Sequence, residues 1–251
     1  MDQAIRKEPM PMRDEEIPMD LEFQTERGEK ETSAHLKKHF FDLPARSDLH
    51  LKRKLWHVVT GTMMAFGYQL IGNRTEVASL FFVLFVFSIS MELMRLRFPN
   101  VNRRVMVLFK HVMRSHETRS VSGMPYYIGA VAIAVALFPP PVAVLSILYL
   151  AWGDPISSLS GILWGKDKIF QDKSLVGTMA GFLICSLITF LYLGSTGILP
   201  GRVLLISLLG GIVAAVTEIL PFNIDDNASI PLISGFFLWL LFLASGYPPG
   251  F

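Results

Sequence analysis

The stretch Val142–Leu163, VAVLSILYLAWGDPISSLSGIL, is apolar and about as long as a bilayer-spanning helix, yet an aspartate and a proline interrupt it. A helix needs about 20 residues to cross the ~30 Å hydrocarbon core of a bilayer. Similar apolar runs occupy residues 55–71, 77–94, 121–138, 175–193, 203–220 and 230–245. The sequence therefore predicts an all-α fold, a polytopic membrane helix bundle of about seven transmembrane helices, with a tight turn at the prolines 139–141.

The charged residues are concentrated ahead of these runs. Residues 1–54 hold eleven of the 23 Lys and Arg and twelve of the 21 Asp and Glu. Residues 1–50 mix both signs with several prolines, which predicts a disordered cytosolic tail, and residues 51–251 form the expected membrane domain. The one cysteine, Cys185, lies in an apolar run, so a disulfide framework is excluded.

The basic residues predict which side of the membrane each loop faces. With seven spans, one side holds Lys52–Lys54, the cations between residues 95 and 119, and those between 166 and 173, while the other holds only Arg74 and Arg202. The positive-inside rule makes the rich side cytoplasmic, with the N-terminus. The membrane is expected to be the endoplasmic reticulum in a eukaryote or the inner membrane in a bacterium. Residues 101–113 alternate apolar and basic faces, which predicts one interfacial amphipathic helix.

Polar groups at the cytoplasmic ends of the spans are candidate functional residues, because charges in lipid are costly. Arg53, Lys54 and His57 stand at the mouth of the first span, where ordinary interfacial anchoring is the simpler interpretation. Glu92 and Arg95 are three residues apart on one helix face, so they predict an ion pair that is either structural or part of a site.

The third group lies within the stretch quoted above. Asp154 followed by Pro155 predicts a broken helix, whose new N-terminus would suit a phosphate group. Asp154 beside that phosphate is a candidate ligand for Mg²⁺, which favours one or two carboxylates together with phosphate oxygens. Small residues after Asp154 equally suit close helix packing.

The fourth group is Glu218 near the end of the sixth span, followed by Asp225, Asp226 and Asn227. Three carboxylates in nine residues form a hard-oxygen cluster for a divalent cation, although an exposed Asp and Asn turn is the plain alternative for residues 225–227. Carboxylates for metal and lysines for phosphate, all on one face, predict a phosphoryl- or nucleotidyl-transfer site whose second substrate is a lipid.

The order and spacing of these motifs resemble the CTP-dependent lipid kinases, the family of dolichol kinase, phytol kinase and the fungal-type diacylglycerol kinase, which are relatives of phosphatidate cytidylyltransferase. The resemblance covers residues 52–246. It rests on Arg53-Lys54-x-x-His57, Glu92-x-x-Arg95, GMPYYIG at 123–129, Gly153-Asp154-Pro155 with Gly161, Gly165 and Lys166, Lys173-Ser174-Leu175-x-Gly177-Thr178, and Glu218-x-x-Pro221 with Asp226-Asn227 and Pro231.

The resemblance implies transfer of the γ-phosphoryl group of CTP to a lipid alcohol such as diacylglycerol, a polyprenol, dolichol or phytol, with Mg²⁺. It implies no nucleic acid partner. Asp154, Glu218 and Asp226 would hold Mg²⁺, and with Lys173 would form the catalytic set. The implied nucleotide- and phosphate-binding residues are Arg53, Lys54, His57, Gly153, Gly161, Lys166, Ser174, Gly177, Thr178 and Asn227.

Two other functions remain open at this point. A cytidylyltransferase would attack the α-phosphorus of CTP and make CDP-diacylglycerol, and the Gly-Asp and Lys-Ser elements suit it as well. An ion-coupled transporter would use Asp154 and Glu218 as a relay at a broken helix. The oligomeric state and the identity of the lipid alcohol are not encoded in any motif.

Overall fold

The computed structural model describes residues 51–110, 112–166, 168–170, 173–220 and 224–248. The predicted tail of residues 1–50 and Pro221 therefore lie outside the described residues. The helices are α2 (Leu51–Ile71), α3 (Arg74–Arg97), α4 (Pro99–Leu108), α5 (Gly123–Leu137), α6 (Pro140–Leu148), α7 (Asp154–Trp164), α8 (Leu175–Thr196), α9 (Val203–Ile219) and α10 (Asp226–Ala244). Shorter elements are η1 (Ser115–Thr118), η2 (Tyr149–Gly153), η3 (Pro200–Arg202) and the antiparallel strands β1 (Lys168–Phe170) and β2 (Lys173–Ser174).

Within the described residues, five helical segments are long and apolar enough to cross a membrane. They are Arg74–Arg97, Pro140–Trp164, Leu175–Thr196, Pro200–Ile219 and Asp226–Ala244, and α5 is a shorter apolar helix. The helix α2 is 21 residues long but is not in that set. The structure therefore confirms an apolar helix bundle, while the number of seven crossings stays a prediction.

Local sequence signals account for the helix ends. Asn73 caps α3, since its side chain accepts hydrogen bonds from the backbone amides of Thr75 and Glu76. Gly197, with φ 68°, ends α8 in the left-handed conformation that glycine adopts at little cost. The prolines 139–141 separate α5 from α6, as predicted, with Pro140 in the first turn of α6, where its missing N–H costs nothing.

The helix was predicted to break at Asp154, and this prediction is wrong because the helix is continuous there. The chain instead makes a π-helical turn over Tyr149–Gly153 and runs straight into α7, with Gly153 and Asp154 both in right-handed helical conformation. Pro155 removes one i→i−4 donor, and the π-turn accommodates this within a continuous helix by inserting an extra residue. No free helix N-terminus forms at Pro155, so a phosphate bound near Asp154 would depend on other groups.

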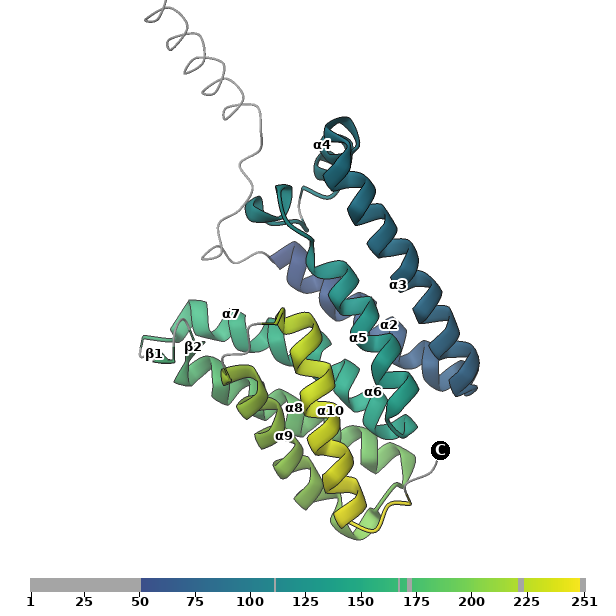
Figure 1. The fold of residues 1–251 in the computed structure, drawn as a ribbon. Coiled ribbons are helices and arrows are strands. Elements are labelled where there is room, and N and C mark those ends of the chain that lie inside the picture. The colour runs from purple at the N-terminus through teal and green to yellow at the C-terminus, as the bar shows by residue number, and fades with distance from the viewer. Residues whose placement is uncertain (1–50, 111, 167, 171–172, 221–223, 249–251) are drawn as a thin grey trace, which may run out of the picture. The chain divides into compact units, whose positions relative to one another are not determined.

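The continuous segment from α6 to α7 is the centre of the bundle. In it, 67% of the membrane-length window is buried, compared with 22% for α3. Its residues Val142, Leu145 and Leu150 are fully buried in a core shared with Leu238 and Phe242 of α10. The helix α9 packs against both α8 and α10, and in Figure 1 α3 runs along α5.

The helix α4 is shorter than the predicted interfacial helix of residues 101–113. It ends at Leu108, and Phe109 caps it. Met106 is buried, whereas Val107 and Leu108 are exposed. The amphipathic helix is thus present, and its position at a membrane surface stays a prediction.

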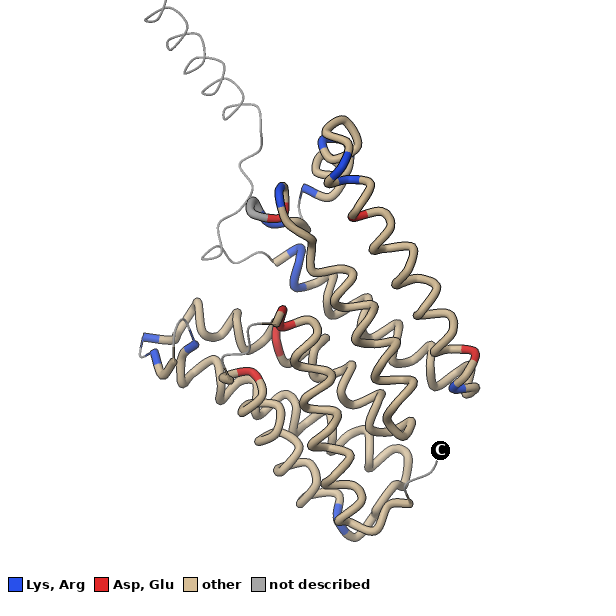
Figure 2. Tube along the Cα trace, viewed as in Figure 1, with Lys and Arg blue, Asp and Glu red and all other residues tan. Residues whose placement is uncertain are grey.

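The charges of the bundle lie at the ends of its helices. Figure 2 shows long stretches of the membrane-length helices without a single charged residue, and the acidic residues at the facing ends of α9 and α10. This arrangement brings charged side chains that are distant in sequence to the same end of neighbouring helices.

Candidate active site

Lys173 joins the ends of α9 and α10 by two ion pairs. Its Nζ lies 3.2 Å from Oε1 of Glu218 and 3.6 Å from Oδ2 of Asp226. Glu218 is in the last turn of α9 and only 8% exposed, and Asp226 is the first residue of α10. We call Lys173, Glu218, Asp226 and the neighbouring Asp154 the Lys173 cluster. The structure therefore brings together four of the residues predicted from sequence.

The charge of Lys173 is set by these neighbours. Burial lowers the pKa of Lys173, but the attraction of Glu218, Asp226 and Asp154, together with the hydrogen bond to Glu218, outweighs it, and the pKa is raised above the usual value. The side chain is therefore protonated and positively charged at neutral pH, which suits it to bind a phosphate group rather than to act as a base.

Asp154 lies at the start of α7, within electrostatic reach of residues of α2 and β2. It is half-buried, and it interacts electrostatically with Lys54 and His57 of α2 as well as with Lys173. The His57 ring stacks on Tyr127, with ring centroids 5.1 Å apart and an interplanar angle of 8°. The N-terminal end of α2 and the Lys173 cluster are therefore parts of one site.

Several buried polar atoms at this site have no hydrogen bond of ordinary geometry to the described residues. They are Nζ of Lys54, Nδ1 of His57, Oγ1 of Thr178 and Oε2 of Glu218. Buried polar groups in proteins are almost always hydrogen-bonded, so such a set around Asp154 points to a polar ligand. Nζ of Lys54 and the Thr178 hydroxyl can donate to an anion, Nδ1 of His57 can donate or accept, and Oε2 of Glu218 can bind a cation that accompanies the anion.

The predicted Lys-Ser and glycine motif packs α7 against α8. The Ser174 hydroxyl caps α8 by accepting a hydrogen bond from the amide of Gly177 at 3.2 Å. A Cβ added to Gly161 would lie 2.9 Å from that hydroxyl, and one added to Gly165 would collide with it. One added to Gly177 would lie 2.7 Å from the carbonyl oxygen of Ser157. Ser174 and these glycines therefore have a packing role that positions Lys173, in addition to the phosphate contact predicted for Gly161, Ser174 and Gly177.

The remaining glycine of the site motif, Gly153, lies in the π-turn. A Cβ there would be 2.8 Å from the Cys185 sulfur, so this position is also confined by packing. Lys166 is exposed just before β1, apart from the buried part of the cluster. Its predicted contact with phosphate stays a prediction.

Asp225 and Asn227 build the start of α10. Oδ1 of Asp225 accepts hydrogen bonds from the backbone amide of Asn227 at 2.9 Å and from its Nδ2 at 2.6 Å. Asp225 thus caps the helix, while Asp226 is the one that reaches Lys173. The Asn227 side chain lies against Gly123, and a Cβ at Gly123 would collide with its Nδ2 and would lie 3.3 Å from Nη2 of Arg53.

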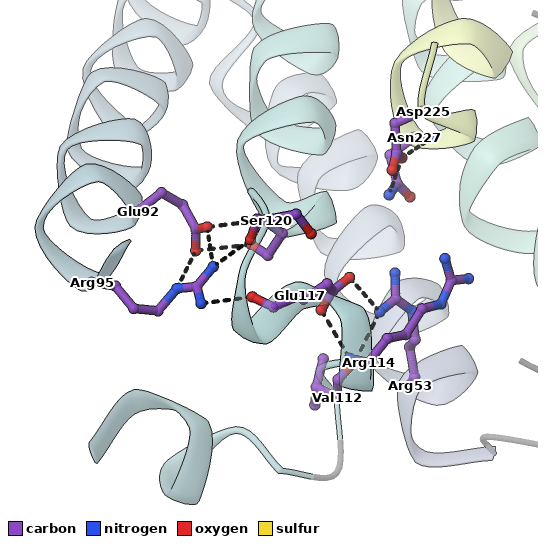
Figure 3. A network of polar contacts seen from close by, with 10 residues as sticks. Arg53, Glu92, Arg95, Val112, Arg114, Glu117, Ser120, Asp225 and Asn227 are labelled. Atoms are coloured by element: carbon purple, nitrogen blue, oxygen red, sulfur yellow. Dashed lines mark hydrogen bonds and ion pairs between the residues drawn. The ribbon is translucent and has the colours of Figure 1, made fainter. Parts of the chain in front are cut away.

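Glu92 and Arg95 form the predicted pair, and it is buried and structural. Arg95 Nη2 lies 2.5 Å from Glu92 Oε2, and Arg95 also donates to the carbonyl oxygens of Glu117 and Ser120. Glu92 in turn accepts from the amide and hydroxyl of Ser122. Figure 3 shows that this pair holds the segment that precedes α5.

Glu117 is a site residue that the sequence did not reveal. It lies in η1, is 3% exposed, and accepts a hydrogen bond from Nη1 of Arg53 at 3.1 Å. The two residues are 64 positions apart, so no local spacing indicates that they meet. A lone buried glutamate next to a motif arginine is visible only once the fold is known.

No three His, Cys, Asp or Glu side chains within the described ranges converge closely enough to hold a metal ion by themselves. In the Lys173 cluster, the ammonium group lies between the carboxylates. A cation at this site would therefore need oxygen atoms from a substrate as well as from the protein.

Named proteins are similar to this chain over most of its length. CTP-dependent diacylglycerol kinase 1 of Saccharomyces cerevisiae is 28% identical over 229 residues, 82% of this chain and 78% of that protein. The protein of the same name from Schizosaccharomyces pombe is 29% identical over 60% of this chain and 74% of its own length. The probable phytol kinase 1 of Oryza sativa subsp. japonica is 28% identical over 77% of this chain and 65% of its own length.

No family model matches the chain, and no solved structure matches it. The names of these relatives agree with the resemblance drawn from the motifs. The relatives thus support the CTP-dependent lipid kinase family for this chain.

Proposed function

We propose that this protein transfers the γ-phosphoryl group of CTP to the hydroxyl of a lipid alcohol at a membrane surface. The observation that carries the proposal is the Lys173 cluster, in which a partly buried cation and three carboxylates lie near Nζ of Lys54, which has no hydrogen bond to the described residues. Relatives named for CTP-dependent phosphorylation of diacylglycerol support the donor and the class of acceptor.

The basic residues of the site would neutralise the charge of the triphosphate. Phosphoryl transfer depends mostly on positioning and on neutralising negative charge, so cations around the triphosphate supply much of the catalysis. Lys54 and Lys173 approach Asp154 from α2 and β2 and are the residues for this task, with Arg53 beside them. Lys173 is held by the buried Glu218 and Arg53 by the buried Glu117, which reduces the reorganisation that these two side chains need in the transition state.

The same residues fit Mg²⁺. Asp154, Glu218 and Asp226 are the carboxylates that would hold it, and Oε2 of Glu218 has no hydrogen bond of ordinary geometry to the described residues. Mg²⁺ commonly takes one or two carboxylates plus substrate phosphates, which agrees with a cluster that cannot close around a metal alone. When bound, the metal would neutralise charge on the transferring phosphoryl group.

The membrane arrangement supports access of a lipid. Glu218 and Asp226 of the cluster lie at the ends of two membrane-length helices, where the hydroxyl of diacylglycerol, phytol or a polyprenol would lie at the headgroup level. We infer that this end faces the cytoplasm, because Arg74 and Arg202 are the only basic residues of the predicted opposite loops.

The test is a transfer assay with purified protein in detergent. Diacylglycerol, phytol and a polyprenol are offered in turn, with Mg²⁺ and with CTP labelled at the α or γ phosphorus, or with γ-labelled ATP. We expect label from γ-CTP in one of the lipids and at least tenfold less from ATP. Label from α-CTP in lipid would instead indicate a cytidylyltransferase, and no transfer in any arm would contradict the proposal.

A further inference from the structure

We propose that Glu117 is a positioning residue that holds the guanidinium of Arg53 against the nucleotide phosphates. The inference rests on the proposed function, because it gives Arg53 a ligand in the triphosphate of CTP. Glu117 acts through Arg53 and needs no contact with the nucleotide.

Among the described residues, the hydrogen bonds of the Arg53 guanidinium are all made by Nη1. Its Nη1 donates to the carbonyl oxygen of Val112 at 3.0 Å and to Oε1 of Glu117 at 3.1 Å. The Arg53 side chain is 12% exposed and that of Glu117 is 4% exposed, so this pair is largely removed from water. A buried guanidinium that lost its carboxylate would be costly to keep in place.

The opposite edge of Arg53 points into the site. Nη2 lies 3.3 Å from where a Cβ of residue 123 would be, and Nδ2 of Asn227 approaches the same point. In Figure 3, the guanidinium of Arg53 lies between Glu117 and Asn227. No hydrogen bond from Nη2 to the described residues accompanies this geometry, so that edge is available to an anion. Gly123 leaves room for it.

Glu117 is itself fixed from both sides. Its Oε2 accepts a hydrogen bond from the amide of Arg114 at 2.9 Å, and its carbonyl oxygen accepts one from Arg95 at 2.7 Å. The buried pair of Glu92 and Arg95 therefore anchors Glu117, and Glu117 anchors Arg53. This chain of contacts runs from α3 to α2 without using any residue of the Lys173 cluster.

The charge balance explains why a carboxylate is needed here. Arg114 and Asp225 also lie within electrostatic reach of His57, as do Arg53 and Asp154. Two arginines near one ring repel each other, and Glu117 contacts both, through the side chain of Arg53 and the backbone of Arg114. Replacing its charge would let Arg53 turn away from the site.

The experiment is a binding measurement by equilibrium dialysis of labelled CTP with Mg²⁺ in detergent, without a lipid acceptor. Wild type, Glu117→Gln, Arg53→Ala and the double variant are compared. We expect Glu117→Gln to raise the Kd for CTP about tenfold with an unchanged number of sites per protein, and to have less than a twofold effect in the Arg53→Ala background. Glu117→Asp, which keeps the charge, should recover part of the affinity. Glu76→Gln, an exposed carboxylate at the start of α3, is the matched control and should bind as wild type does.

The outcomes separate this inference from the proposed function. A structural role alone would lower the number of binding sites and leave Kd unchanged, and this result would overturn the inference. The inference would also be overturned if Glu117→Gln raised the Kd for CTP by the same factor in the wild-type and the Arg53→Ala backgrounds. If the wild type binds no CTP, the proposed function fails as well. If Glu117→Gln does not fold, Glu117→Asp decides, because an affinity equal to that of Glu76→Gln would contradict a role that depends on carboxylate position.

Discussion

The ammonium group of Lys173 lies 3.2 Å from Oε1 of Glu218, which joins the hairpin after α7 to the last turn of α9. Glu218 is buried in an apolar helix, so its carboxylate depends on this cation for compensation. The pair therefore links the stability of the bundle to the chemistry of the site.

Replacing Lys173 with Met should separate these two contributions. We expect Lys173→Met to lose at least 100-fold in transfer rate, and to lower the free energy of unfolding by about 2 kcal/mol because a buried carboxylate loses its partner. Mg²⁺ should then raise the thermal midpoint of the variant more than that of the wild type, since it takes the place of the cation. Thermal unfolding in detergent with and without Mg²⁺ measures this, and equal shifts in the two proteins would argue against a metal site in the cluster.

The raised pKa of Lys173 predicts how stability depends on pH. A group with a raised pKa in the folded state contributes stability that is complete below its unfolded pKa, near the usual 10.5, and is lost as pH rises through the folded value. The difference in thermal midpoint between wild type and Lys173→Met should thus be constant from about pH 7 to 9.5 and should shrink above about pH 10.5. A difference that already shrinks near pH 8 would mean that the pKa is lowered.

Gly123 should tolerate no side chain. The Cβ of Gly123→Ala would displace Asn227 and crowd Nη2 of Arg53, so we expect CTP-dependent transfer to fall at least tenfold. Gly67→Ala is the control, because its Cβ would meet nothing within 4 Å and alanine favours the helix by about 0.5–1 kcal/mol. The two variants are compared by transfer assay and thermal unfolding. Equal activity in both would rule out close packing at Gly123 as a requirement.

The pair of Glu92 and Arg95 should matter more for stability than for chemistry. Arg95 is 1% exposed and its guanidinium bonds Glu92, Asn102, Glu117 and Ser120. Removing one partner of a buried pair typically costs 3–5 kcal/mol, so Arg95→Met should lower the free energy of unfolding by about 3 kcal/mol or more. The exposed Arg97→Met, two residues further on, should change it by less than about 0.5 kcal/mol. Denaturant unfolding in mixed micelles compares the two, and similar values would contradict the structural role.

Local sequence patterns were enough to predict most of the helices. The apolar runs and the amphipathic segment correspond to helices in the structure. The prolines 139–141 mark the boundary between α5 and α6. The form of the chain at Asp154 was not predictable, because a proline in an apolar run is compatible with either a break or a π-turn. The π-turn begins at Tyr149, which is 1% exposed and hydrogen-bonds to Thr189 of α8, a contact distant in sequence.

The site was predictable where its residues lie in polar interruptions of apolar runs. Asp154, Lys173, Glu218 and Asp226 stand out for that reason, and they do meet. Glu117 could not be found in the same way, since it lies in a polar segment between helices, where a glutamate is ordinary. Asp226, the carboxylate that the resemblance implies, is the one that pairs with Lys173, whereas Asp225 caps α10.

The most direct test of the central claim is the transfer of γ-label from CTP to a lipid alcohol by wild type, Asp154→Asn and Glu76→Gln, at equal amounts of folded protein. Asp154 interacts with both lysines of the site, whereas Glu76 is an exposed carboxylate at the opposite end of α3 from Glu92. The account predicts labelled lipid with wild type and Glu76→Gln, and a loss of at least 1000-fold with Asp154→Asn. Near-normal transfer by folded Asp154→Asn would contradict it.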